Sequence, residues 1–279
     1  MFRFFLYLCA VKRSLTILII LLFSAPIKLQ AERPVLAFGD GERLEFTVSY
    51  RARMWPNTVV GDITLSVLEQ QGLFTIVGRG RSRSFFRWFF DVNDTYTIVM
   101  DAETLRPLTY SERTRQGNRH FNADFKFDWD SMVVNTSWRN LNRHAENSYK
   151  TMPITEDCVD AVSLFYRLRN TDPATLRVGV PVPLNMVLRN SIRQTSYTFL
   201  GREVLNIPGV GRFNTFKFSV MLVTSGDETF QDGSRFYIWI SDDLNRIPLQ
   251  VQSPIRVGSV RIRLAGHSGL KHPLTSRIR

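Results

Sequence analysis

The segment Thr155–Arg169, TEDCVDAVSLFYRLR, carries the clearest helical period of the chain. Thr155 is a suitable N-cap residue, two carboxylates follow it in the first turn, and Arg167 and Arg169 fall in the last turn. Apolar residues recur along one side of the expected helix at Cys158, Val159, Val162, Phe165 and Leu168. The sequence therefore predicts a helix of roughly four turns over residues 155–169, with one buried face.

The chain on both sides of this segment alternates apolar and polar residues with a period of two, which is typical of amphipathic strands. The clearest examples are Leu44–Arg51, Gly61–Val67 and Phe121–Trp129, and we count about thirteen candidate strands. Helices do not alternate regularly with strands, so a parallel α/β sheet is excluded. The predicted fold is mainly β, with a strongly curved antiparallel sheet or half-open β-barrel and one principal helix at about 155–169.

The N-terminal residues 1–31 predict a secretory signal peptide, in which two basic residues precede the apolar run Ser14–Ser24 and cleavage follows Ala31. The run has 11 residues, fewer than the roughly 20 that cross a bilayer, so an uncleaved membrane anchor is the less favoured alternative. We expect one β-rich domain over residues 32–266 and a flexible basic tail over residues 267–279. The expected location is the periplasm of a Gram-negative bacterium.

The charge of the chain is positive, with a formal net charge of +11 at pH 7, and arginine greatly outnumbers lysine. Arginine suits contact with carboxylate or phosphate, although many of these side chains are expected to be solvent-facing partners of acidic residues. An exported protein has little access to nucleic acid, so the expected partner is anionic lipid or another envelope component. Cys158 is the single cysteine after the signal peptide, and we expect it to be a buried apolar side chain without a disulfide-linked partner.

Several motifs follow one another in a fixed order along the chain. The sequence FGDGERL lies at Phe38–Leu44 and DAETLRP at Asp101–Pro107. A D-x-x-S-x-x-Y-x-x-R pattern is met by Asp160, Ser163, Tyr166 and Arg169, and the remaining motifs are Gly61, Trp239–Asp243, Pro248–Leu249 and Val257–Gly258. Together, over roughly residues 37–266, these motifs resemble the bacterial exported family catalogued as domain of unknown function 3108.

The resemblance implies a curved antiparallel sheet in the bacterial envelope, with no activity assigned. The outline is similar to the half-open barrels of periplasmic lipoprotein carriers, which is an analogy of shape alone. Spacing on a helix would place Asp160 and Arg169 on opposite faces, so we expect a structural role for the four residues of the helical motif. The sequence departs from the family at Cys158 and at Phe85–Phe86, where no family pattern is known.

The segment Gly78–Asp91, GRGRSRSFFRWFFD, combines alternating arginines with a nearly unbroken aromatic run. The candidate ligand-binding residues of this segment are Arg79, Arg81, Phe85, Phe86 and Trp88. One interpretation is a buried connector that crosses the mouth of the sheet. The other is an aromatic lip with a basic rim, which would engage an acyl chain and an anionic head group at a membrane interface.

A second group of candidate ligand-binding residues lies on one face of the strand 121–129. Phe125, Phe127 and Trp129 alternate with polar residues and give this face an unusually aromatic character. Such a face either fills a core or lines a cavity. Our leading hypothesis is a non-catalytic periplasmic protein that binds a hydrophobic or amphiphilic envelope molecule, and the alternative is a structural or adaptor protein of the envelope with a filled core.

Catalytic motifs are mostly absent from the sequence. His120, His144, His267 and His272 have no metal-ligand spacing, and there is no G-x-S-x-G, P-loop or paired-cysteine zinc pattern. Asp91–Asp94 resembles a calcium loop only in its oxygen atoms. We therefore expect no catalytic residues, metal or cofactor, while a hydrolase for an envelope polymer, assembled from distant residues, remains a second alternative.

Overall fold

The computed structural model describes residues 35–52, 55–88, 90–142, 147–221, 234–255 and 258–279. Residues Leu36–Arg279 form one compact unit. The expected signal peptide over residues 1–31 lies outside the described residues. No helix within the described part of the chain has the length and apolar character that would let it span a membrane.

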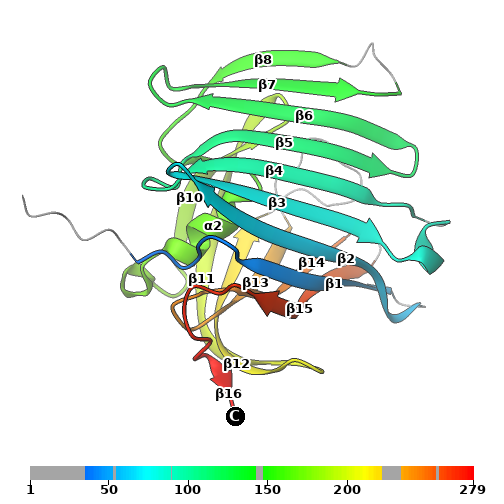
Figure 1. The fold of residues 1–279 in the computed structure, drawn as a ribbon, viewed down its shortest axis with the longest axis vertical. Helices are drawn as coiled ribbons and strands as arrows, with labels where there is room; N and C mark the ends of the chain where they lie inside the picture. Colours follow the sequence, from blue (N-terminus) through cyan, green and yellow to red (C-terminus); the bar gives the residue numbers. More distant parts are fainter. Residues whose placement is uncertain (1–34, 53–54, 89, 143–146, 222–233, 256–257) are drawn as a thin grey trace, which may run out of the picture. The chain divides into compact units, whose positions relative to one another are not determined.

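Strands dominate the described chain, with one α-helix and two short 3-10 helices (Figure 1). The strands before the helix are β1 (Arg43–Ala52), β2 (Trp55–Gln70), β3 (Leu73–Ser82), β4 (Asn93–Asp101), β5 (Pro107–Gln116), β6 (Arg119–Asp128), β7 (Val133–Asn140), β8 (Ser148–Pro153) and β9 (Cys158–Val159). Those after it are β10 (Pro181–Leu188), β11 (Ser191–Ile207), β12 (Gly211–Met221), β13 (Arg235–Ser241), β14 (Pro248–Pro254), β15 (Ser259–Ser268) and β16 (Arg277–Ile278). The helices are η1 (Ser84–Phe86), α2 (Ser163–Asn170) and η3 (Pro173–Thr175).

All strands belong to one sheet with the order β8-β7-β6-β5-β4-β3-β2-β1-β15-β14-β13-β12-β11-β10-β9, and β16 pairs with β12. Neighbouring strands are antiparallel, except that β9 runs parallel to β10 through Cys158 and Asn185. The sheet is curved and does not close, because β8 and β9 stand at opposite ends of the strand order (Figure 1). The predicted fold class, a curved antiparallel sheet with one principal helix, is therefore confirmed.

The predicted bounds of the helix are wrong at the N-terminal end, because α2 begins at Ser163 and not at Thr155. The carboxylate of Asp160 accepts hydrogen bonds from the backbone N–H groups of Val162 at 2.8 Å and Ser163 at 2.9 Å, and also from the hydroxyl of Ser163. Cys158 lies in β9 instead of the helix. Asp160 thus performs the capping role that the sequence suggested for Thr155.

The helix joins two of the three groups of buried apolar side chains. Tyr166 packs with side chains of β3 to β7 and with Phe38, whereas Leu164 and Leu168 pack with side chains of β10 to β13. The third group lies around Phe46 on β1. The buried side of α2 consists of Ser163, Leu164, Tyr166, Leu168 and Arg169, which differs from the apolar stripe that the sequence predicted.

Arg169 makes the principal polar contact of this core. Its guanidinium donates to both carboxylate oxygens of Glu42 at 2.6 Å, and to the carbonyl oxygens of Ala37 at 3.1 Å and Asn245 at 3.0 Å. Both charged side chains are buried, and Phe38 contributes a cation–π contact at 5.3 Å. Burial opposes the charge of Arg169, but the charge and hydrogen bonds of Glu42 leave its pKa raised. Arg169 thus ties α2 to the segment before β1.

The C-terminal residues 267–279, which we expected to be flexible, are held against the sheet. Asn245 exchanges hydrogen bonds of 2.8 Å with the backbone of His272, and β16 pairs with Arg212 and Phe213 of β12. The buried Ser276 accepts from the backbone of Asn214 through its carbonyl oxygen. The polar, aperiodic composition of the tail does not reveal these long-range bonds, and its expected flexibility stays a prediction.

Candidate functional site

The connection between β3 and β4 forms a turn, and we call its described residues, Ser84–Trp88 and Phe90, the aromatic lip. At its base the hydroxyl of Ser82 donates to the carbonyl oxygen of Phe90 at 2.6 Å and accepts from the backbone of Val92 at 3.0 Å. Within the lip, the backbone N–H of Phe86 donates to the carbonyl of Arg83 at 2.8 Å. The lip lies beyond the end of β3 (Figure 1). These bonds hold a defined conformation outside the sheet.

The aromatic rings of the lip are turned to solvent. Phe85 is 70 % exposed, Trp88 73 % and Phe90 60 %. Phe86 is half-buried and meets Phe85 edge to face, with the ring centroids 5.1 Å apart. Phe89 lies outside the described residues. The interpretation as a buried connector is therefore wrong for this segment, since three large apolar rings within six residues lie on the surface.

Arginine side chains accompany the lip. Arg79 and Arg81 are exposed on β3, and Arg87 is exposed within the lip. Within the described chain none of these three has an acidic partner at ion-pair distance. Arg83 differs, because its guanidinium binds Asp62 with contacts of 3.0 and 2.8 Å. The charge of Arg83, at the base of the lip, is thus neutralised by Asp62. The charges of Arg79, Arg81 and Arg87 are available to an anion.

The aromatic face of β6 has a different environment from the lip. Phe125 and Phe127 are only 5 % exposed and belong to the core beneath the sheet. Trp129 is partly buried, stacks on Phe127 at 5.8 Å and donates to the carbonyl oxygen of Pro107 at 2.8 Å. Phe125 and Phe127 thus belong to the core and Trp129 packs against it, while their role in ligand binding stays a prediction.

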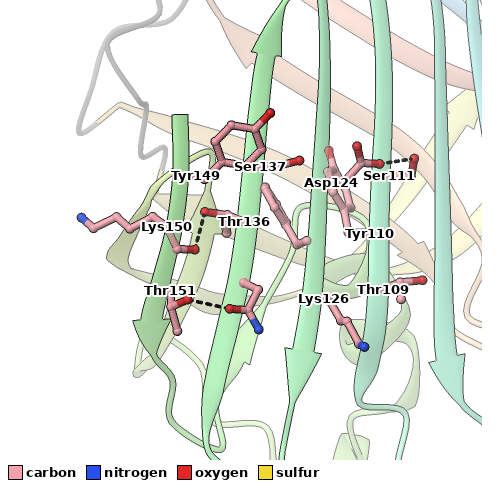
Figure 2. A pocket seen from close by; sticks show the side chains of 12 residues that line it. Thr109, Tyr110, Ser111, Asp124, Lys126, Thr136, Ser137, Tyr149, Lys150 and Thr151 are labelled. Atoms are coloured by element: carbon pink, nitrogen blue, oxygen red, sulfur yellow. Dashed lines mark hydrogen bonds between the residues drawn. The ribbon is translucent and has the colours of Figure 1, made fainter. Parts of the chain in front are cut away.

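An open hollow of about 710 Å³ crosses β5 to β8 (Figure 2). Two cross-strand rows of polar side chains flank it, one of Thr109, Lys126, Asn135 and Thr151, the other of Ser111, Asp124, Ser137 and Tyr149. Several of these groups already bind one another, as Thr151 does with Asn135 at 2.6 Å and Ser111 with Asp124 at 3.0 Å. The sequence analysis did not find this surface, because its rows depend on strand register.

Two acidic residues, the buried Asp94 on β4 and the partly buried Glu112 on β5, have no hydrogen-bonded cation among the described residues. Asp94 accepts from the backbone of Arg115 at 3.0 Å and from the side chain of Gln116 at 2.5 Å. Glu112 accepts from the hydroxyls of Tyr110 at 3.0 Å and Thr114 at 2.9 Å. Burial raises the pKa of both carboxyl groups. Sequence alternation could have placed both on the inner face, but it could not show how they are paired.

The groups suggested for catalysis do not converge in the described residues. Cys158 is buried, and its sulfur lies 3.7 Å from the hydroxyl oxygen of Thr155. His120 lies 2.9 Å from the carbonyl oxygen of Gly117, and His272 lies 2.9 Å from that of Leu36. His144 lies outside the described residues. Within the described part of the chain, no group of three or more His, Cys, Asp or Glu side chains could hold a metal ion.

The fold and these surfaces define a class of protein, an open curved antiparallel sheet held by one buried helix. The family DUF3108, described as "Protein of unknown function", matches residues 45–265, and the chain belongs to this family. The resemblance inferred from the motifs is thereby confirmed. A search of curated proteins finds no match.

A solved structure with the same kind of fold is the beta-barrel-like protein of domain of unknown function DUF1849 from Brucella abortus. The two chains share 10 % sequence identity with a TM-score of 0.56, and the match covers 84 % of this chain and 99 % of the other. At this level of identity the similarity shows the fold alone. It supports the description of the sheet and adds no statement about a ligand.

Proposed function

We propose that this protein is a non-catalytic protein of the bacterial cell envelope that binds anionic amphiphiles, such as the lipids of a membrane surface, through the aromatic lip. The observation that carries the proposal is the exposure of Phe85, Trp88 and Phe90 on the turn between β3 and β4. Aromatic rings favour the boundary between head groups and acyl chains, and nearby arginines attract anionic head groups. The predicted signal peptide supports the envelope location.

The packing of the interior favours binding at the surface over enclosure of a ligand. The side chains around α2, among them Phe38, Tyr166 and Cys158, are almost inaccessible to water. A carrier with an enclosed acyl chain would need free volume at this place. The amphiphile is therefore bound at the lip, and the sheet serves as the rigid support that presents it.

The proposal is tested with a lip variant that carries Phe85→Ser, Trp88→Ser and Phe90→Ser. Because these rings are exposed, the variant should keep the melting temperature of the original protein within a few degrees. It should lose most of its retention on vesicles that contain phosphatidylglycerol. The retention of the original protein should weaken with added salt, because the arginines act through screened charge.

A matched control replaces three exposed valines outside the lip by serine, at Val178, Val180 and Val204. This variant removes apolar surface but should bind vesicles as the original protein does. If the original protein fails to bind, or if the lip variant binds equally well, the proposal is wrong. If the lip variant is unstable, the single change Trp88→Ser repeats the comparison with a smaller disturbance.

A structural or adaptor protein of the envelope is the second candidate, and the filled interior favours it. Such a protein would act through its surface or through an exposed strand edge, for which β8 at one end of the strand order is suitable. An adaptor would show no vesicle binding and would bind another protein of the envelope. Absence of lipid binding in the experiment above, together with a stable fold, would favour this candidate.

A further inference from the structure

Two arginines of β15 lie side by side on the sheet face opposite the core. Ile262 and Leu264 of this strand pack with the third group of buried apolar side chains. Successive side chains of a strand point to opposite faces, so Arg261 and Arg263 share the other face. Their Cα atoms are separated by two residues, or about 7 Å along the strand. This spacing brings two guanidinium groups close to each other.

Both arginines are held in place by glutamines of the neighbouring strand β14. The guanidinium of Arg263 donates to the side-chain oxygen of Gln250 at 2.8 Å, and that of Arg261 donates to Gln252 at 3.0 and 3.2 Å. Gln250 is buried, which fixes its position. An amide oxygen accepts a hydrogen bond but carries no net charge. The glutamines thus orient the arginines without neutralising them.

The other neighbour of β15 in the sheet is β1, which contributes hydroxyl groups at the positions paired with Arg261 and Arg263. Thr47 of β1 pairs with Arg263, and Ser49 pairs with Arg261. Ser49 is buried and Thr47 is half-buried. A hydroxyl group donates a hydrogen bond and adds no negative charge. The two arginines therefore lie between a row of amides and a row of hydroxyls.

The carboxylates on this face are bound to other cations. Asp62 lies across from Thr47 but binds Arg83, and Glu45 binds Arg43 at 3.0 Å. No carboxylate of the described chain accepts a hydrogen bond from Arg261 or Arg263. Burial, and then the charge of Arg261, lower the pKa of Arg263. The pair thus has an unfavourable electrostatic environment that a bound anion would relieve.

We propose that Arg261 and Arg263, with the hydroxyls of Thr47 and Ser49, form a binding site for the phosphate group of a phosphorylated ligand. A tetrahedral phosphate can accept hydrogen bonds from two guanidinium groups at once, whereas a carboxylate usually accepts both of its hydrogen bonds from one guanidinium group. The hydroxyls can donate to a further oxygen. The phosphate can belong to a free phosphate ester or to a lipid head group.

The test is titration calorimetry of the purified protein with inorganic pyrophosphate at fixed ionic strength, repeated with the double variant Arg261→Gln, Arg263→Gln. We expect the double variant to bind at least tenfold more weakly, because it loses two charged donors. The control is the double variant Arg115→Gln, Arg177→Gln, which removes the same charge from exposed positions away from the lip. It should bind pyrophosphate within about twofold of the original protein, since it lacks only long-range attraction.

A second arm identifies the source of the phosphate with vesicles of phosphatidylcholine that contain phosphatidic acid. In this arm the arginine pair is changed in the lip variant Phe85→Ser, Trp88→Ser, Phe90→Ser, so that the lip does not contribute to vesicle binding. Saturable pyrophosphate binding that the arginine pair variant loses supports a soluble phosphate ester. Binding to the vesicles alone, lost in the same variant, supports a lipid head group. No binding in either arm, or equal binding by the pair variant and the original protein, overturns the proposal.

The variant Arg263→Lys distinguishes loss of binding from loss of folding, because it keeps the positive charge and removes the planar guanidinium. If the double variant has a lowered melting temperature, Arg263→Lys should still weaken pyrophosphate binding in a protein that melts normally. Unchanged affinity in a folded Arg263→Lys variant would overturn the bidentate contact. The lip plays no part in the pyrophosphate titration, so failure there leaves the vesicle result with Phe85→Ser, Trp88→Ser and Phe90→Ser unaffected.

Discussion

Arg169 of α2 and the arginine pair of β15 show two opposite ways of placing positive charge in one protein. Arg169 is buried and has a carboxylate, Glu42, within 2.6 Å, together with two carbonyl oxygens. Arg261 and Arg263 are half-buried, and the acceptors that they find in the described part of the chain are glutamine oxygens. The first charge is compensated within the protein, while the second is left for an external anion.

The difference shows why arginine content alone says little about function. A buried charge must be compensated by the protein itself, because desolvation costs several kcal/mol per ion. A charge on the sheet face keeps part of its hydration and can remain uncompensated at smaller cost. The site of an arginine in the fold therefore decides whether it holds the core together or meets a ligand.

The largest expected effect comes from breaking the compensated pair. Glu42→Gln leaves the buried charge of Arg169 without its carboxylate and should lower the free energy of unfolding by about 3 to 5 kcal/mol. Urea denaturation followed by tryptophan fluorescence measures the change. Glu45→Gln is the matched control, because Glu45 forms an exposed pair with Arg43, and it should cost less than about 1 kcal/mol. Equal effects of the two changes would contradict the comparison.

A smaller effect is expected at Asp160, where backbone and hydroxyl donors compensate a buried carboxylate in place of a cation. Asp160→Ala leaves the N–H groups of Val162 and Ser163 without acceptor and should lower the free energy of unfolding by about 2 to 3 kcal/mol. Asp160→Asn keeps an acceptor oxygen and should cost clearly less. Denaturation midpoints of both variants give the comparison. If Asn and Ala are equally harmful, capping is not the role of this side chain.

The carboxyl groups of Asp94, which is buried, and Glu112, which is partly buried, extend the comparison to negative charge, and their effect on stability depends on pH. Burial raises both pKa values, so each group keeps its proton to a higher pH in the folded protein than in the unfolded chain. Their contribution to stability is complete below the ordinary values of 3.8 and 4.5. It is lost as the pH rises through the raised values.

Glu112→Gln tests this dependence, because glutamine can still accept from Tyr110 and Thr114 but does not titrate. The fall in the free energy of unfolding as the pH increases from the acidic range to neutrality should be smaller in the variant. Urea denaturation at several pH values measures the slope for both proteins. An unchanged slope would show that Glu112 does not contribute to it.

The smallest effect is expected on the exposed side of β3. Arg79→Gln and Arg81→Gln should each change the free energy of unfolding by less than about 0.5 kcal/mol, because these side chains are exposed and have no acidic partner in the described chain. Thermal unfolding at low salt detects the change. A loss comparable with that of Glu42→Gln would mean that these arginines also compensate a buried charge.

The fold could be predicted from the sequence to a large extent. Alternation with a period of two identified most strands, and the ordered motifs indicated the family. Glycine positions have a clear physical reason in the structure, since a side chain at Gly61 would approach the carbonyl oxygen of Arg81 to 2.8 Å. The bounds of α2 could not be predicted, because the pairing of Cys158 with Asn185 excludes residues before Asp160 from the helix.

The sequence predicted which residue types make up the candidate site, but it did not predict which of these side chains are buried and which are exposed. Phe85 and Phe125 both belong to aromatic segments, yet one is 70 % exposed and the other 5 %. Strand alternation around Phe125 suggested one buried face, while the unbroken run around Phe85 gave no direction. The arginine pair can be seen in the alternation of β15, but its neighbours Gln250 and Thr47 come from strands on both sides.

The sequence by itself determined most strands, the basic residues in the last turn of the helix, and the aromatic and arginine-rich character of the lip, because these depend on residues close together in the chain. Only the tertiary structure decided which charges are compensated. Glu42 and Arg169 are 127 residues apart in sequence and meet at 2.6 Å. Burial and charge pairing arise when distant strands come together, so their energy is fixed by the register of the sheet and the packing of α2.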